Sequence, residues 1–144
     1  MNEFLLPLLK WVGGKRQLLP ELTAKMPGTF NTYFEPFIGG GAMLFELHPK
    51  KAVVGDINGE LINFYNAVKN NVEPLLKLLF TYQNTKEFFL DKRNIDRDPE
   101  KFNLLTSIEK AARTYYLNRT CFNGLYRVNS KGLFNTPYGH YKSP

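Results

Sequence analysis

The stretch YFEPFIGGGAMLFEL, residues 33–47, places three consecutive glycines between a strand-like aromatic run and an apolar run. Residues 30–34 predict a short strand that ends at the glycine turn, and residues 41–47 predict a helix. Because glycine carries no side chain, a ligand can approach the main chain at such a turn and meet the N–H groups that begin the helix. The stretch predicts a ligand-binding turn in an α/β fold; a turn without a ligand is the alternative.

A second strand and helix follow. Residues 52–55 form an apolar run of the kind found in buried strands, and Asp56 stands at its carboxyl end. Residues 59–69 carry apolar side chains at helical spacing. Strand, glycine turn, helix, strand, acid and helix are the start of an α/β sheet with parallel strands.

The spacing of these residues limits the class of ligand that the turn can bind. A dinucleotide fingerprint needs G-x-G-x-x-G, and Leu44 occupies the place of its third glycine. A P-loop fails as well, because Leu9 and Arg16 replace its first glycine and its Ser or Thr. Asp56 follows Gly39 by seventeen residues, where a carboxylate can accept hydrogen bonds from both hydroxyls of a ribose. The pattern favours an adenosine compound without a pyrophosphate.

The charge distribution points to a polyanionic partner. The net charge is +6, and residues 113–144 contain five Lys or Arg and no Asp or Glu, whereas residues 1–112 carry fourteen basic and thirteen acidic side chains. A basic block attracts nucleic acid through Coulomb forces and counterion release. A simply solvated face is the alternative interpretation.

Composition indicates one ordinary globular core. The 144 residues are 43% apolar and 15% aromatic, and the single cysteine, Cys121, cannot form an internal disulfide. We find no signal-like leader and no apolar run of membrane-spanning length, so we expect a cytoplasmic protein without a membrane or metal partner.

The sequence pattern changes at two points in the second half of the chain. From residue 72 onward the pattern is helical, and Thr106 and Glu109 have the spacing of a capping box. Residues 124–134, GLYRVNSKGLF, then alternate apolar and polar positions on both sides of a turn at 129–132. This alternation predicts a β-hairpin.

Four stretches together resemble the Dam-type, D12-class DNA adenine methyltransferases: LKWVGGKRQLLP at 9–20, FEPFIGGGA at 34–42, GDIN at 55–58 and NRTCFNGLYRVNSKGLFNTPYGHYKSP at 118–144. The resemblance implies S-adenosylmethionine as methyl donor and the exocyclic N6 of adenine in duplex DNA as acceptor. It also implies a Rossmann-like sheet with a helical insertion and a β-hairpin for DNA recognition. Residues 1–71 would then begin the cofactor-binding domain, and residues 72–144 would form the target-recognition region.

The resemblance assigns two sets of residues. The stretch 9–20 contains Trp11, whose indole can pack on a ligand, and Lys15, whose ammonium can pair with the carboxylate of a ligand. The cofactor set is Trp11, Lys15, Pro36, Phe37, Gly39, Gly41 and Asp56. Ordinary core packing and solvation are the alternatives for Trp11, Lys15 and Phe37.

The DNA set lies in the last stretch. Arg127 can present two parallel donors to guanine, and Phe122 can stack where adenine leaves the helix. His140 departs from the arginine usual in members that read GATC, so the target sequence stays open. The DNA set is Phe122, Asn123, Leu125, Arg127, Lys131, Pro137, His140 and Lys142. Core packing is the alternative for the aromatic residues.

The family's Asp-Pro-Pro-Tyr-like catalytic motif is not in these 144 residues, since no two prolines are adjacent. We therefore expect the chain to be an N-terminal part of a methyltransferase that is inactive alone. Uncovered sheet edges would favour self-association. A non-catalytic DNA-binding module and a nucleotide-dependent oxidoreductase are the competing functions, and Leu44 disfavours the latter.

Overall fold

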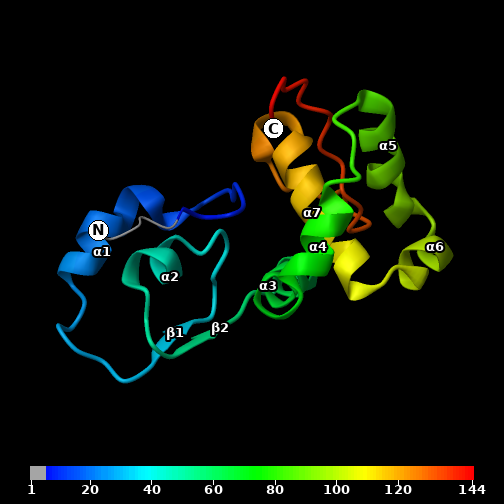
Figure 1. Cartoon of the computed structure of the whole chain (residues 1–144). Coiled ribbons are helices and arrows are strands. Elements are labelled where there is room, and N and C mark those ends of the chain that lie inside the picture. Colours follow the sequence, from blue (N-terminus) through cyan, green and yellow to red (C-terminus); the bar gives the residue numbers. More distant parts are fainter. Residues whose placement is uncertain (1–5) are drawn as a thin grey trace. The chain divides into compact units, whose positions relative to one another are not determined.

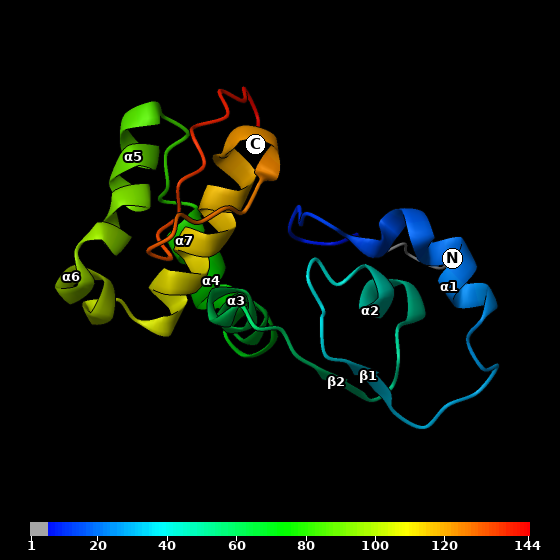
Figure 2. The same ribbon diagram turned by 180° about the vertical axis from the view of Figure 1, so that it is seen from behind.

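The protein forms two compact units, Met1–Ile57 and Asn58–Pro144. The computed structural model describes residues 6–144 (Figure 1). Its first unit holds a small sheet with short helices, and its second unit is helical (Figure 2).

The sheet of the first unit consists of two parallel strands, β1 (Tyr33–Glu35) and β2 (Ala52–Val54). The register pairs Phe34 with Val53. Helix α2 (Ala42–Leu47) connects the strands, as a parallel crossover requires. The 3₁₀ helix η1 (Lys15–Leu18) and helix α1 (Leu19–Ala24) pack against α2. The predicted parallel pairing is confirmed, although β1 begins at Tyr33 rather than at Phe30.

The fold is therefore mixed α/β with a small parallel sheet. The part of the chain that the structure describes contains no third strand of a Rossmann-like sheet. The side chains of Phe34 and Val53 are 66% and 56% exposed, so one apolar face of the pair is uncovered.

The second unit is built around helix α7 (Ser107–Thr120), which packs against α3 (Gly59–Asn70), α4 (Val72–Leu79) and α5 (Lys86–Asn94). Helix α6 (Pro99–Leu104) and the 3₁₀ helix η2 (Ile95–Arg97) connect α5 to α7. The core contains Phe89, Tyr116, Leu117, Cys121 and Phe134.

The capping box predicted for α7 is confirmed. The side chain of Thr106 accepts a hydrogen bond from the Glu109 N–H at 3.2 Å, and the Glu109 carboxylate accepts one from the Thr106 N–H at 2.8 Å. Two N–H groups that the helix itself cannot satisfy are thereby bonded.

The predicted β-hairpin forms only in part. Val128 and Phe134 make one antiparallel bridge around a turn that Gly132 and Asn129 close by a 2.9 Å backbone hydrogen bond. Two backbone hydrogen bonds flank the bridge, from the Asn129 N–H to the Leu133 carbonyl and from the Asn135 N–H to the Arg127 carbonyl, each at 2.9 Å. The N–H groups of Lys131 and Leu133 donate instead to the Asn129 amide oxygen. The loop 127–135 is thus a side-chain-stabilised turn.

Across residues 6–144, no helix has the length and apolar character needed to cross a membrane. The same residues contain no group of three or more His, Cys, Asp or Glu side chains placed to hold a metal ion.

Candidate functional site

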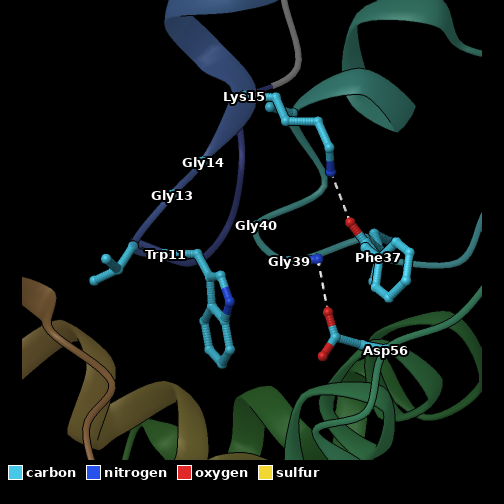
Figure 3. Close-up of a pocket in the computed structure, with 11 residues that line it drawn as sticks. Trp11, Gly13, Gly14, Lys15, Phe37, Gly39, Gly40 and Asp56 are labelled. Carbon is cyan, nitrogen blue, oxygen red and sulfur yellow. Dashed lines mark hydrogen bonds between the residues drawn. The ribbon is translucent and has the colours of Figure 1, made fainter.

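A cavity of about 290 Å³ lies between two glycine-containing turns of the first unit, residues 11–15 and 37–40 (Figure 3). Small-molecule sites commonly enclose roughly 300–1,000 Å³, so this cavity is at the lower end of that range. Its lining residues are Trp11, Val12, Gly13, Gly14, Lys15, Phe37, Ile38, Gly39, Gly40, Ala42 and Asp56.

The glycine turn packs against Trp11. Gly39 has a φ of +51°, and a Cβ atom there would lie 3.0 Å from Cδ1 of the indole. A Cβ atom at Gly40 would lie 3.2 Å from Cβ of Trp11 and 3.3 Å from the carbonyl oxygen of Leu9. Glycine at these two positions therefore allows the two turns to pack against each other. The fold itself needs this close packing, whether or not a ligand is bound.

Asp56 reaches the cavity from the end of β2. Its Oδ2 accepts a hydrogen bond from the Gly39 N–H at 3.0 Å, which ties the strand end to the glycine turn (Figure 3). A carboxylate can accept about four hydrogen bonds, and the bond to Gly39 uses one of them. An acid at the carboxyl end of a parallel strand suits a ribose.

Lys15 has protein partners in the described structure. Its ammonium lies 3.1 Å from Oε1 of Glu35 and 2.6 Å from the carbonyl oxygen of Phe37. An ammonium has three hydrogens, so these two bonds leave one for a ligand carboxylate. The turn therefore holds Lys15 in place, and a carboxylate ligand would be its third partner.

Glu35 was not among the predicted site residues. Its side chain is 5% exposed, and Oε2 has no hydrogen-bond partner among the described residues. Burial, followed by the negative charge of Glu35, raises the pKa of Tyr33 to about 12. The sequence signal was an acid inside a strand that is otherwise apolar, which requires a cationic partner when it is buried.

Five of the seven predicted cofactor residues line the cavity: Trp11, Lys15, Phe37, Gly39 and Asp56. Gly41 is instead the N-cap of α2, with a φ of +75° and its N–H bonded to the Ile38 carbonyl at 2.9 Å. Pro36 lies next to Gly55, the residue that follows β2: its carbonyl oxygen is 3.7 Å from the position of a Cβ on Gly55. These two residues shape the turn from outside the cavity.

The prediction missed several lining residues, among them Gly13, Gly14 and Gly40. Gly13 has a φ of +72°, and a Cβ at Gly14 would lie 3.0 Å from the Trp11 carbonyl oxygen. The signal was present in WVGGK: the family resemblance assigned its Trp11 and Lys15 to the cofactor, but its two glycines were considered only as part of a P-loop, whose spacing they do not fit.

In the second unit, the predicted DNA residues lie mostly at the surface. Phe122 is 53% exposed and Leu125 is half-buried. Asn123 adopts a left-handed φ of 54°, and its N–H donates to the Tyr141 hydroxyl at 2.9 Å. The exposed members of the set are Phe122, Asn123, Arg127, Lys131, Pro137, His140 and Lys142.

Two of these side chains have defined local partners. Arg127 donates from Nε to the Asn135 amide oxygen at 2.8 Å and from Nη2 to the Asn135 carbonyl at 3.3 Å. A guanidinium carries five N–H donors, so Arg127 is oriented while donors remain for a ligand. The His140 ring lies edge-on to Tyr138 with ring centroids 4.8 Å apart.

Only some of the basic residues in the C-terminal block, residues 113–144, are exposed at the surface. Arg113 is only 5% exposed and forms an ion pair with Asp96 at 2.8 Å. The exposed cations of residues 113–144 are Arg127, Lys131 and Lys142. They sit on the C-terminal segment that follows α7.

Comparison with known proteins shows the family of the chain. The family model for D12 class N6 adenine-specific DNA methyltransferases matches residues 11–144. A protein of Lactococcus lactis subsp. cremoris named Type II methyltransferase M1.LlaDCHI is 55% identical over 96% of this chain and 49% of its own length. The Type II methyltransferase M.MjaIII of Methanocaldococcus jannaschii is 41% identical over 96% of this chain and 53% of its own length.

The DNA adenine methylase of Haemophilus influenzae is 38% identical over 95% of this chain and 48% of its own length. The chain thus spans about half the length of these curated relatives. The chain belongs to the D12 class N6 adenine-specific DNA methyltransferase family.

Proposed function

We propose that this chain supplies the cofactor pocket and the DNA-recognition region of an enzyme that transfers a methyl group from S-adenosylmethionine to the N6 of adenine in duplex DNA. The observation that carries the proposal is the cavity itself. Trp11, the glycine turn and Asp56 come together there from three separate parts of a chain whose relatives are named adenine methylases.

The cavity residues fit the donor. The Asp56 carboxylate would accept from the ribose hydroxyls, and the Trp11 indole would pack on an apolar part of the ligand. The remaining hydrogen of the Lys15 ammonium would bond the carboxylate of the methionine moiety. When bound, S-adenosylmethionine supplies a methyl group on a sulfonium, and these side chains would orient it.

The C-terminal segment fits duplex DNA. Arg127 would read guanine through its oriented fork, because two parallel donors discriminate bases. Lys131 and Lys142 would contact phosphates as point charges. The exposed ring of Phe122 would stack at the step from which adenine is removed. In this proposal residues 1–71 contribute to cofactor binding, and residues 72–144 bind the target DNA.

Calorimetric titration of the purified chain with S-adenosylmethionine and with a nicotinamide dinucleotide tests the cofactor. We expect binding of the first and none of the second. Tighter binding of the dinucleotide would favour the oxidoreductase, and binding of duplex DNA without either nucleotide would favour the non-catalytic module.

Paired substitutions test the DNA region. Arg127→Ala should remove discrimination at one base pair, worth about 1–3 kcal/mol, whereas Lys131→Ala should weaken binding to all sequences alike. Equal losses on preferred and random duplexes for Arg127→Ala would contradict the assignment.

The uncovered face of the sheet supports a further part of the proposal. Phe34 and Val53 are directly paired and both exposed, so their side chains share one apolar face. We expect two copies of the chain to associate there. Sedimentation at increasing concentration would show a monomer at all concentrations if this expectation is wrong.

A further inference from the structure

The loop 127–135 is tied to the helices through Phe134. The Phe134 ring is 2% exposed and belongs to the core of the second unit. Its backbone N–H donates to Oδ2 of Asp96 at 2.8 Å, and its carbonyl accepts from Nη2 of Arg97. Both main-chain polar groups of Phe134 are therefore held by the side chains of two adjacent residues in η2.

Asp96 and Arg97 make the hydrogen bonds to Phe134 that a neighbouring β-strand would make. Val128 pairs with Phe134 on one side, so the backbone groups of Phe134 on the other side need partners. A carboxylate accepts from the N–H, as a strand carbonyl would, and a guanidinium donates to the C=O. Charge-assisted bonds are roughly twice as strong as neutral ones, so this anchor is firm.

The anchor is itself held from inside the second unit. Arg113 of α7 lies 2.8 Å from Oδ2 of Asp96, and it donates to the carbonyls of Lys92 at 2.8 Å and Arg93 at 3.0 Å. The side chains of Arg113 and Asp96 are 6% and 10% exposed. The end of α5 and the middle of α7 thus fix the carboxylate that holds the loop.

We propose that Asp96 and Arg97 are positioning residues for sequence recognition, which orient loop 127–135 so that Arg127 meets a base edge correctly. The inference rests on the proposed role of this loop as the DNA reader. Base readout needs the arginine fork aligned with the base, whereas phosphate contacts mainly supply affinity. Loss of the anchor should therefore reduce discrimination more than general affinity.

Arg97→Lys is the most informative variant. It keeps the positive charge, but one ammonium cannot reproduce the planar fork that bonds both Asp96 and the Phe134 carbonyl. Arg93→Lys is the matched control, because the side chain of Arg93 bonds only its neighbour Asn94, at 3.4 Å, and within residues 6–144 it does not bond loop 127–135. Asp96→Glu is the second test variant, since it keeps a negative charge facing Arg113.

The probe is a pool of duplexes with a randomised window, selected by binding to the 144-residue chain and sequenced. We expect the wild-type chain to enrich a defined set of sequences. Arg97→Lys and Asp96→Glu should reduce the ratio of best to median enrichment by about tenfold, the discrimination of one arginine–guanine contact. Arg93→Lys should leave the ratio unchanged.

Thermal unfolding and circular dichroism of each variant identify any that is unfolded at the assay temperature, and the folded variants decide the outcome. A lower melting temperature with an unchanged enrichment ratio would overturn the proposal, because it would show that the anchor only stabilises the fold. A wild-type chain that enriches no sequence would overturn the reader role of the loop, and this inference with it.

Discussion

At Gly39 the backbone turns with a φ of +51°, and the side on which a Cβ atom would project faces the indole of Trp11. The same residue donates its N–H to Asp56. Gly39 thus lies between an aromatic wall and an acidic strand end, and any larger residue there alters both. A cofactor bound in this cavity would meet a turn whose shape the protein has already fixed.

Gly39→Ala should distort the cavity. A non-glycine residue in the left-handed region costs about 1–2 kcal/mol, and the added Cβ would also press against Trp11. Trp11 is the only tryptophan in the sequence, so its fluorescence reports this unit alone. We expect a shifted emission and weaker binding of S-adenosylmethionine.

Gly28→Ala is the control for this change, because a Cβ at Gly28 meets nothing within 4 Å. An emission spectrum and cofactor affinity that are the same in Gly39→Ala, Gly28→Ala and the wild type would show that the close approach to Trp11 has no consequence.

Asp56→Ala should weaken binding of S-adenosylmethionine by about 1–3 kcal/mol, the scale of hydrogen bonds to a charged acceptor. Asp56 also holds the Gly39 N–H, so a second variant must separate the two roles. Asp56→Asn keeps one acceptor oxygen for Gly39 and should preserve Trp11 emission while still losing affinity. Asp91→Asn, at a side chain that is 71% exposed, controls for charge. Calorimetry showing full affinity in both Asp56 variants would remove this residue from the ribose site.

At the scale of elements, most of the confirmed predictions rest on neighbouring residues, and the parallel pairing of the two strands is the long-range exception. The strand at 52–54, the crossover helix and the Thr106 capping box depend on neighbours within a few residues, and each was predicted from the sequence. The Lys15–Glu35 pair joins residues twenty apart, and the Asp96–Phe134 bond joins residues thirty-eight apart. No periodicity encodes such contacts, because they arise only once helices and turns have packed.

The hairpin shows the limit of pattern reading within an element. Alternation at 124–134 indicated two paired strands, but the Asn129 side chain accepts from the Leu133 N–H, which a ladder would bond to the Asn129 carbonyl, and a single bridge forms within this stretch. The cavity shows the same limit: the glycine turn was predicted, whereas in the opposite turn Trp11 and Lys15 were predicted and Gly13 and Gly14 were not.

The capping box of α7 makes a prediction at this scale. Thr106→Ala should lower the free energy of unfolding by about 1 kcal/mol, the usual cost of losing a side-chain cap. Urea titration followed by circular dichroism measures it. Thr81→Ala is the control, because the Thr81 hydroxyl bonds only the Leu78 carbonyl at the end of α4 and caps no helix start.

The capping box of α7 also predicts how the stability of the fold depends on pH. Hydrogen bonds from the backbone N–H of Thr106, then from its side chain, lower the pKa of Glu109 below its ordinary value of 4.5. A lowered pKa in the folded state means that the ionised carboxylate stabilises the fold above about pH 4.5, and that this contribution is lost as the pH falls further. Glu109→Gln should therefore lose less stability than the wild type on acidification. Identical acid-unfolding curves for the two proteins would refute this linkage.

For the whole molecule, the two parts of the proposed chemistry occur in different compact units. The cavity belongs to Met1–Ile57, and the exposed basic segment belongs to Asn58–Pro144. Each unit can therefore be tested by its own ligand, S-adenosylmethionine for the first and duplex DNA for the second. In the proposed function methyl transfer requires both ligands, but binding alone would not supply the acceptors that the adenine amino group needs.

We predict that the 144-residue chain transfers no methyl group when given S-adenosylmethionine and duplex DNA. The amino nitrogen of adenine is a poor nucleophile, because its lone pair is delocalised into the ring, and catalysis requires acceptors that hold and orient it. The Asp-Pro-Pro-Tyr-like motif that the family resemblance assigns to this task does not occur in these 144 residues. Incorporation of labelled methyl groups should therefore stay at background, while full-length M1.LlaDCHI assayed beside it gives turnover. Methylation by the 144-residue chain at a comparable rate would show that acceptors other than this motif hold the adenine amino group.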